Sequence, residues 1–327
     1  MSWLVSPGET KTFQKGQTHL KSVRVGRGQM LSLRNVVVLP VIAVVAIAAG
    51  GAGAPMAPPT LVSGGFQTPE SILYEPRSDV YLVSNINGDP TASDGNGFIS
   101  RVAPDGRILE LKWIDGAKPG VRLNGPKGMA VAGDTLYVSD ITAVRMFDLR
   151  TGAPKGAVVI LGSTFMNDLA AGRDGTIYAT DTGVRPDFSP SGTDAVYKID
   201  PSGKLSVVVK SPDLHSPNGI TVLPDGTLVV VSFSQTGEVY TLGPGGAKQK
   251  VWKLPSGNLD GVEMRPGGAL LISSWGASAV FQLERDGTIQ TVVSNVPSPA
   301  DIGYDSKRDR VLIPIFMENR LVIQPLR

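Results

Sequence analysis

The sequence predicts an all-β fold, a six-bladed β-propeller of four-stranded antiparallel blades. Three observations indicate this fold. A strand-turn-strand unit recurs six times, tight-turn dipeptides separate the strands, and no helical stripe of apolar residues competes with the strand pattern. A repeat of this length is typical of propellers, in which each blade is one supersecondary unit.

Each repeat contains an apolar strand, a turn, a second β-rich strand that ends in small or acidic residues, and at least one further strand. The six copies occupy residues 68–84, 125–148, 166–200, 217–242, 259–283 and 299–323. Equivalent positions are 57, 40, 51, 42 and 40 residues apart, which is the length of a blade with two insertions.

The turns and the chain start add detail to this prediction. Asp174-Gly175, Asp225-Gly226 and Asp286-Gly287 provide the positive φ angles that tight hairpins require. Residues 60–66 are expected to close the ring by pairing with the last blade, which removes a free sheet edge. An array of β-sandwiches is the alternative, but one innermost strand per 40-residue period favours blades.

The N-terminal region differs from the rest of the chain. Residues 36–49 form an uncharged apolar run between Arg34 and the small-residue stretch 50–54, which is the order found in secretory signals. The run is short for a membrane span, which needs about 20 residues. We therefore expect residues 1–54 to be a leader, either a signal peptide or a retained membrane anchor, and residues 55–327 to be an exported periplasmic or extracellular domain.

Composition excludes several classes of function. The chain has no cysteine, so disulfides, thiolate nucleophiles and cysteine-ligated zinc are impossible. It has 31 basic and 29 acidic residues, but six basic residues and one acidic residue lie in the leader, which leaves 25 basic and 28 acidic residues. Without a basic cluster on the folded part, nucleic acid is not expected as a partner.

A set of polar residues occupies one register of the repeats. In a propeller the innermost strands begin at the central channel, so residues at this register should converge. The register reads Glu70, Lys127, Asn167, Asn218, Asp260 and Ala300. Its four oxygen donors describe a Ca²⁺ site, or a Mg²⁺ or Mn²⁺ site. The alternative is that these residues only cap turns at the blade entrances.

Four segments of this register, residues 69–71, 167–168, 217–219 and 259–261, resemble in order and spacing the metal-binding segments of the senescence-marker-protein/gluconolactonase family. These proteins are also called regucalcin-like lactonases, and the paraoxonases resemble the chain more distantly. The resemblance covers residues 61–324 and implies a lactone-hydrolysing enzyme for a small-molecule substrate. It also implies a divalent cation, usually Ca²⁺ with Mg²⁺, Mn²⁺ or Zn²⁺ as alternatives, and Asp260 as both a ligand and a candidate base. The implied ligands are Glu70, Asn167, Asn218 and Asp260.

The chain departs from the family pattern at two positions. Members that act on sugar lactones have an arginine two residues before the Asn-Asp pair, whereas this chain has Phe165, which favours a more apolar substrate. Lys127 enters the ring where the family does not usually place a cation. It is a catalytic candidate that could orient a carboxylate or an oxyanion, or it could weaken metal binding.

His215 is the only histidine beyond the leader and lies three residues before Asn218. Because its ordinary pKa is near neutral, it is a candidate base, although an exposed or structural role is the alternative. Trp113, Trp252 and Trp275 are expected to pack between blades rather than to line a pocket.

The sequence leaves two main functional hypotheses. The first is an exported metal-dependent lactonase or similar ester hydrolase. The second is a non-catalytic propeller that binds a protein, a peptide or a carbohydrate, because a fold alone does not determine function. An enzyme with an added cofactor is a third possibility, but no dinucleotide-binding glycine motif supports it.

Overall fold

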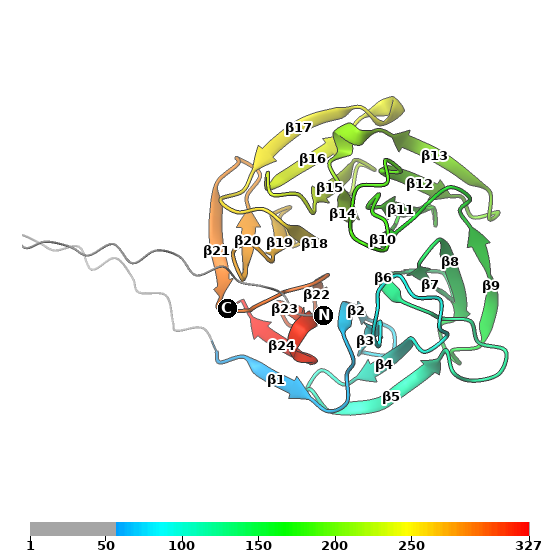
Figure 1. Ribbon diagram of the computed structural model, residues 1–327. Helices are drawn as coiled ribbons and strands as arrows, with labels where there is room; N and C mark the ends of the chain where they lie inside the picture. The colour runs from blue at the N-terminus through cyan, green and yellow to red at the C-terminus, as the bar shows by residue number, and fades with distance from the viewer. Residues whose placement is uncertain (1–56, 327) are drawn as a thin grey trace, which may run out of the picture. The chain divides into compact units, whose positions relative to one another are not determined.

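The computed structural model describes residues 57–326, which form six four-stranded antiparallel sheets around a central axis (Figure 1). This confirms the predicted six-bladed β-propeller. In this part of the chain there is no helix that is long and apolar enough to cross a membrane. The expected leader lies outside the described residues.

In each of the first five blades the four strands follow one another in chain order from the axis to the outside. The first blade contains β2 (Pro69–Glu75), β3 (Val80–Asn85), β4 (Phe98–Val102) and β5 (Ile108–Asp115). The second contains β6 (Pro126–Ala132), β7 (Thr135–Asp140), β8 (Ala143–Asp148) and β9 (Pro154–Val159). The third contains β10 (Met166–Ala171), β11 (Ile177–Asp181), β12 (Ala195–Ile199) and β13 (Leu205–Lys210). The fourth contains β14 (Pro217–Val222), β15 (Leu228–Ser232), β16 (Glu238–Leu242) and β17 (Lys248–Lys253). The fifth contains β18 (Leu259–Met264), β19 (Leu270–Ser274), β20 (Ala279–Leu283) and β21 (Ile289–Ser294).

The sixth blade joins the two ends of the domain. It contains β22 (Gly303–Asp305), β23 (Arg310–Ile315), β24 (Arg320–Pro325) and, as its outermost strand, β1 (Thr60–Ser63). Thr60 pairs with Ile323 and Ser63 with Arg320. The predicted closing strand is thus confirmed over its first four residues.

Three short 3₁₀ helices complete the described part of the chain. They are η1 (Pro212–Leu214), η2 (Pro244–Gly246) and η3 (Phe316–Glu318). The two predicted insertions are the connections 86–97 in the first blade and 182–194 in the third.

The apolar core lies between neighbouring blades. Every residue of β19 is buried, whereas the outer strand β9 is almost entirely exposed. One core cluster combines Val231 of the fourth blade with Leu259 and Ile272 of the fifth. Because each blade covers the face of the next, removal of this apolar surface from water stabilises the ring as a whole.

A β-bulge at the start of the innermost strand in each of the first five blades prepares the candidate site. In the first five blades the pairing with the second strand is interrupted directly after the first paired residue. The interrupted residues are Glu70-Ser71, Lys127-Gly128, Asn167-Asp168, Asn218-Gly219 and Asp260-Gly261, and Ala300-Asp301 lie at the equivalent place in the sixth blade. A bulge redirects side chains. The register predicted from repeat spacing is therefore confirmed, and it coincides with a backbone irregularity.

Candidate metal centre

Four buried oxygen atoms on the axis have no hydrogen-bond partner in the protein. They are Glu70 Oε2, Asn167 Oδ1, Asn218 Oδ1 and Asp260 Oδ1. In residues 57–326 only one other buried side-chain oxygen or nitrogen, Asn96 Oδ1, shares this property. Leaving such an atom unpaired costs about 1–3 kcal/mol. All four residues that the sequence analysis assigns as metal ligands therefore carry an unpartnered oxygen.

Hydroxyl groups of the second strands hold the bulges in place. Thr180 Oγ1 donates to the carbonyl oxygen of Asn218 at 2.6 Å, and Ser273 Oγ donates to that of Ala300 at 2.8 Å. Ser139 Oγ makes the same contact with the carbonyl of Asn167. Each bond joins one blade to the next. The candidate ligands are thus carried by backbone that neighbouring blades fix.

The amide of Asn167 is oriented by a further bond. Its Nδ2 donates to Thr182 Oγ1 at 2.9 Å, which leaves Oδ1 as the unpaired atom. Thr182 Oγ1 donates in turn to the carbonyl of Pro217 at 3.0 Å. An amide held in this way presents an acceptor, which is what a hard cation requires.

Glu70 lies where the first and sixth blades meet. Asp301 N donates to the carbonyl oxygen of Glu70 at 2.9 Å, and Ile72 N donates to that of Asp301 at 3.3 Å. At Gly261 a Cβ atom would overlap the Asp301 side chain and the backbone of Ile302, so only glycine fits after Asp260. Close approach between inner strands therefore explains the glycine that follows this ligand.

Burial and mutual repulsion disfavour the charged forms of the axial carboxyl groups. Burial, followed by the charges of Asp260 and Asp301, raises the pKa of Glu70 well above its ordinary value. Burial and the charge of Asp301 likewise raise the pKa of Asp260. A divalent cation would remove both penalties, since it offers opposite charge and coordination together.

The donor set suits a hard cation with oxygen ligands. Residues 57–326 contain no group of three or more His, Cys, Asp or Glu side chains arranged to hold a metal ion. The axial set instead combines two carboxylates with two amides, a mixture that Ca²⁺ accepts readily.

Lys127 is a buried cation in the same ring. Its side chain is among the largest that are fully buried, and its Nζ donates to the carbonyl oxygens of Pro90 and Gly125, both at 3.1 Å. Nζ also lies 4.2 Å from the centre of the Phe165 ring. Desolvation lowers the pKa of Lys127 to about 8, against the attraction of Glu70. An ammonium group held by two carbonyls and a ring is a fixed positive charge close to Glu70.

His215 is not brought to the axial oxygens. Its Nδ1 lies 3.1 Å from Glu238 Oε2, and 46% of its side chain is exposed. This geometry fits the alternative role of an exposed, paired histidine better than that of a base at the axis.

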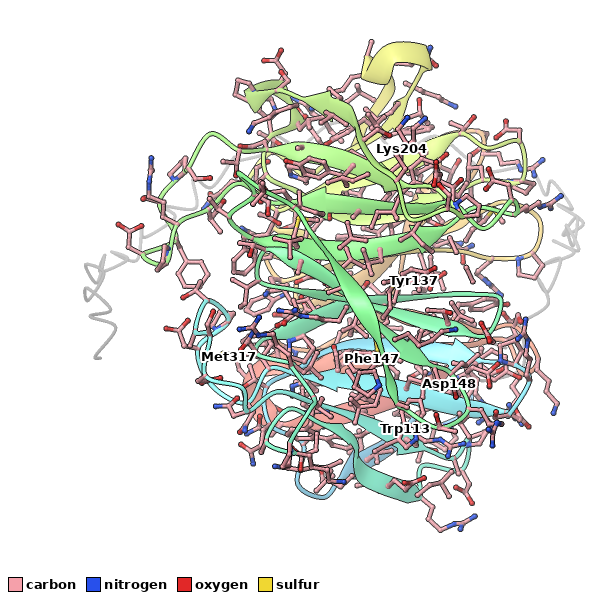
Figure 2. All side chains as sticks on the ribbon, turned by 90° about the vertical axis from the view of Figure 1, so that its right-hand side faces the viewer. Trp113, Tyr137, Phe147, Asp148, Lys204 and Met317 are labelled. Atoms are coloured by element: carbon pink, nitrogen blue, oxygen red, sulfur yellow. The ribbon has the colours of Figure 1, made fainter. Side chains whose placement is uncertain are left out.

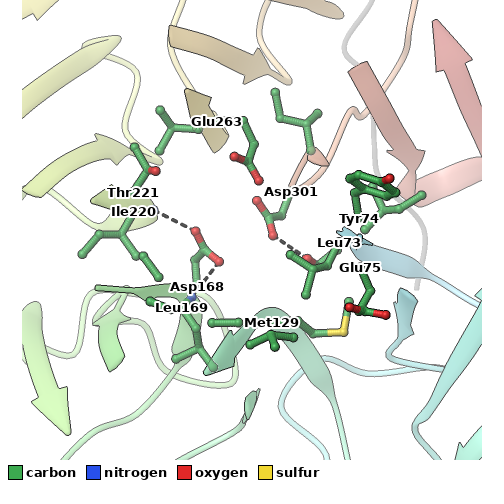
Figure 3. Close-up of a pocket in the computed structure, with 18 of the residues that line it drawn as sticks. Leu73, Tyr74, Glu75, Met129, Asp168, Leu169, Ile220, Thr221, Glu263 and Asp301 are labelled. Atoms are coloured by element: carbon green, nitrogen blue, oxygen red, sulfur yellow. Dashed lines mark hydrogen bonds between the residues drawn. The ribbon is translucent and has the colours of Figure 1, made fainter. Parts of the chain in front are cut away.

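A cavity of about 410 Å³ continues along the channel beyond the candidate ligands. Figure 3 shows Asp168 and Asp301 directed toward each other in this cavity, with Glu263 beside Asp301. Asp301 accepts a 2.5 Å bond from Ser71 Oγ, and Asp168 accepts from the backbone nitrogens of Leu169 and Ile220. Asp168, the second residue of its bulge, and Asp301, at the equivalent place in the sixth blade, thus form an acidic layer in the cavity, next to the layer of candidate ligands formed by the first residues. The repeat register does not identify Glu263, because it lies three residues further along β18.

Glu263 provides a test of the charge balance in this layer. Burial and the charge of Asp301 raise its pKa to about 8, so folding favours the protonated form and stability falls as pH rises through that value. Glu263→Gln should therefore be more stable than the wild type by about 1–2 kcal/mol at pH 9, a figure reduced because the side chain is partly exposed to the cavity. Urea unfolding of metal-free protein at pH 6 and pH 9 would measure this. An equal difference at both pH values would contradict the assignment.

Trp275 packs between aromatic residues of the two neighbouring blades, as expected, but it also contacts a candidate ligand. Its Nε1 donates to Asp260 Oδ2 at 2.7 Å, a contact that the sequence does not predict. Its position has a simple origin: Trp275 follows Ser274, which pairs with Leu259, the residue before Asp260. The repeats locate this backbone position, but they do not give the direction of the Trp275 side chain.

The fold and the site together define a six-bladed propeller with a candidate divalent-cation centre on its axis. Residues 95–303, more than half of the chain, match the SMP-30/gluconolactonase/LRE-like region. The chain belongs to this family, as the sequence resemblance predicts. No curated protein matches the chain in sequence.

Solved structures resemble the described fold at low sequence identity. A gluconolactonase from Xanthomonas campestris is 21% identical, with a TM-score of 0.58 over 84% of this chain and 99% of that one. A virginiamycin B lyase from Staphylococcus aureus is 14% identical, with a TM-score of 0.59 over 83% of this chain and 99% of that one. At these identities the likeness supports the propeller fold alone.

Proposed function

We propose that the chain is an exported hydrolase that opens a lactone, or a similar ester, at a divalent-cation centre on the propeller axis. Membership of the gluconolactonase-like family supports a lactonase-type hydrolase and a small-molecule substrate. The observation that carries the metal dependence is the set of four buried oxygens without partners, on the four residues that the sequence analysis assigns as ligands. We name Ca²⁺ as the cation, with Mg²⁺, Mn²⁺ and Zn²⁺ as alternatives.

The chemistry follows from the charges around the site. When bound, a divalent cation would polarise the carbonyl of the substrate. Asp260 would accept a proton from the attacking water as the water oxygen bonds to the carbonyl carbon. The ring C–O bond then breaks, and the proton passes to the departing alkoxide, which gives a hydroxy acid. The ammonium group of Lys127 would offset the negative charge that develops, and it already opposes the burial that raises the pKa of Glu70.

Aromatic residues near the site favour an apolar substrate. Phe165, two residues before Asn167, packs edge-to-face on Phe188 at 6.2 Å, and 58% of Phe188 is exposed. Across the ring, Phe316 packs on Trp275 at 5.2 Å. Aliphatic lactones are therefore the first substrates to test, ahead of sugar lactones.

Assays on several lactones, with identification of the products, distinguish this proposal from the alternative functions. A hydrolase adds water to a lactone, whereas a lyase opens an ester by elimination and leaves an unsaturated product of unchanged mass. Mass spectrometry of the products distinguishes the two. A folded protein that binds no divalent cation and turns over no lactone would instead support a non-catalytic propeller that binds a protein, a peptide or a carbohydrate.

Metal removal should affect stability and activity together. Because binding to the folded state alone stabilises it, Ca²⁺ at about 100 times its Kd should add about 2.7 kcal/mol to the free energy of unfolding. We expect chelation to abolish lactone hydrolysis and to lower Tm by roughly 5 °C, and added Ca²⁺ to restore both. Differential scanning calorimetry and a pH-stat assay measure the two effects. Full activity after complete chelation would exclude the metal-dependent mechanism.

Export of the domain is part of the same proposal. Residues 1–54 contain an uncharged apolar run between Arg34 and a small-residue stretch, which is the composition of a leader. N-terminal sequencing of the protein recovered from cell fractions would test this: a chain that begins at Met1 in the cytoplasmic fraction would contradict export.

A further inference from the structure

The two oxygens of the Asp260 carboxylate have different surroundings. Oδ2 accepts the hydrogen bond from Trp275 Nε1, whereas Oδ1 is buried without a partner. A carboxylate on a free side chain can exchange its oxygens by rotation, but a bonded oxygen holds the group in one orientation. The hydrogen bond from the indole thus determines which oxygen of Asp260 has no partner in the protein.

Trp275 is itself held on several sides. Its backbone nitrogen donates to the carbonyl of Asn258 at 3.0 Å. Its ring packs at 5.8 Å and 84° on Phe233, and at 5.2 Å and 56° on Phe316. We call Phe233, Trp275 and Phe316 the aromatic cluster. Its members follow the second strands of three consecutive blades, β15, β19 and β23.

The aromatic cluster lies on one face of the ring. Met317, the residue after Phe316, is at one face in the side view and Asp148 is at the other (Figure 2). The three cluster residues are partly buried, whereas Asp260, which Trp275 contacts, is buried.

An indole is well suited to hold a metal-binding carboxylate. It offers one N–H donor and no acceptor, so it cannot bind the cation itself, and it carries no charge that would repel the cation. Partners of this kind fix the side chains that bind a metal, and their loss commonly weakens metal affinity about 10–100-fold.

We propose that Trp275 is the positioning residue of the axial metal centre. Its bond to Oδ2 of Asp260 directs Oδ1 toward the cation, and the aromatic cluster holds the indole in place. The inference rests on the proposed metal centre, but it concerns ion binding and does not require lactone hydrolysis.

The test is Ca²⁺ affinity, measured by isothermal titration calorimetry on the metal-free protein. Trp275→Phe keeps an aromatic ring at this position but removes the N–H donor together with part of the ring volume, and we expect it to bind Ca²⁺ at least 10-fold more weakly than the wild type. Trp252→Phe is the matched control, because Trp252 lies on the outer strand β17 with Lys250 over its ring. The control should keep wild-type affinity, and equal Tm values without metal would show that both variants fold.

A spectroscopic readout separates positioning from a general structural role. In ¹⁵N-labelled protein, the indole N–H signal of Trp275 should shift on addition of Ca²⁺, while the signals of Trp113 and Trp252 should not. An unchanged Trp275 signal, or unchanged affinity in Trp275→Phe, would overturn the inference and leave the proposed hydrolase intact. If Trp275→Phe binds Ca²⁺ more weakly than the wild type but the wild type hydrolyses no lactone, the inference is supported and the proposed activity is excluded. A wild type that binds no divalent cation would overturn both.

Discussion

Replacing Asp260 with asparagine should lower lactone hydrolysis about 1,000-fold or more. The substitution keeps the shape of the side chain but removes the negative charge that binds the cation and the base that accepts a proton from water. Steady-state assays at saturating Ca²⁺ would measure the loss, and calorimetry would show a parallel fall in Ca²⁺ affinity. Asp286→Asn, in an exposed turn where Asp286 accepts from Thr288 N at 2.8 Å, is the matched control and should remain fully active.

Although Asp260→Asn should lower activity and Ca²⁺ affinity, it should increase the stability of the metal-free protein. Because burial and the charge of Asp301 raise the pKa of Asp260, its ionised form weakens folding above the ordinary carboxyl range. The neutral amide avoids this cost. Asp260→Asn should thus be more stable than the wild type at pH 8 under chelation, and less stable with Ca²⁺. A variant that is less stable under both conditions would show a structural role only.

Replacing Lys127 with methionine should reduce kcat about 100-fold and change the pH profile. With a pKa lowered to about 8 by desolvation, Lys127 is charged below that pH and neutral above it. If its ammonium group stabilises developing negative charge, wild-type activity falls as pH rises through about 8, or somewhat lower because a bound cation disfavours a second positive charge. The pH-rate profile of Lys127→Met should lack this falling limb.

A control and a contrary outcome make the Lys127 experiment decisive. Lys204→Met removes an exposed lysine and should leave both kcat and the pH profile unchanged. An increase in Ca²⁺ affinity in Lys127→Met with unchanged kcat would instead favour the other reading of this residue, a cation that weakens metal binding.

Much of this architecture could be predicted from the repeats. The spacing of Glu70, Asn167, Asn218 and Asp260 placed them at one register, and the strand pairing puts all four in equivalent bulges. Repeats carry this information because every blade meets the axis in the same way.

The surroundings of the ligands could not be predicted in the same way. Trp275 reaches Asp260 through a connection between strands, and such connections differ from blade to blade. Lys127 Nζ donates to the carbonyl oxygen of Pro90, which belongs to the inserted connection of the first blade. His215 shows the opposite case: it is close to Asn218 in sequence, but its ring contacts Glu238. Sequence proximity locates backbone, whereas side-chain direction depends on contacts that form only in the folded ring.

The closing strand has a consequence for when the centre can form during synthesis and folding. β1 pairs with β24, and Glu70 is held by backbone bonds to Asp301, so the first and last parts of the domain must meet before Glu70 reaches its place. Contacts between such distant segments form late, because closing a long loop is entropically costly. A nascent chain that still lacks residues 298–327 would carry all four proposed oxygen donors, but Glu70 would not yet be held in place beside Asp301. Binding of the proposed cation would thereby depend on formation of the sixth blade, and a tightly bound ion would indicate a complete ring.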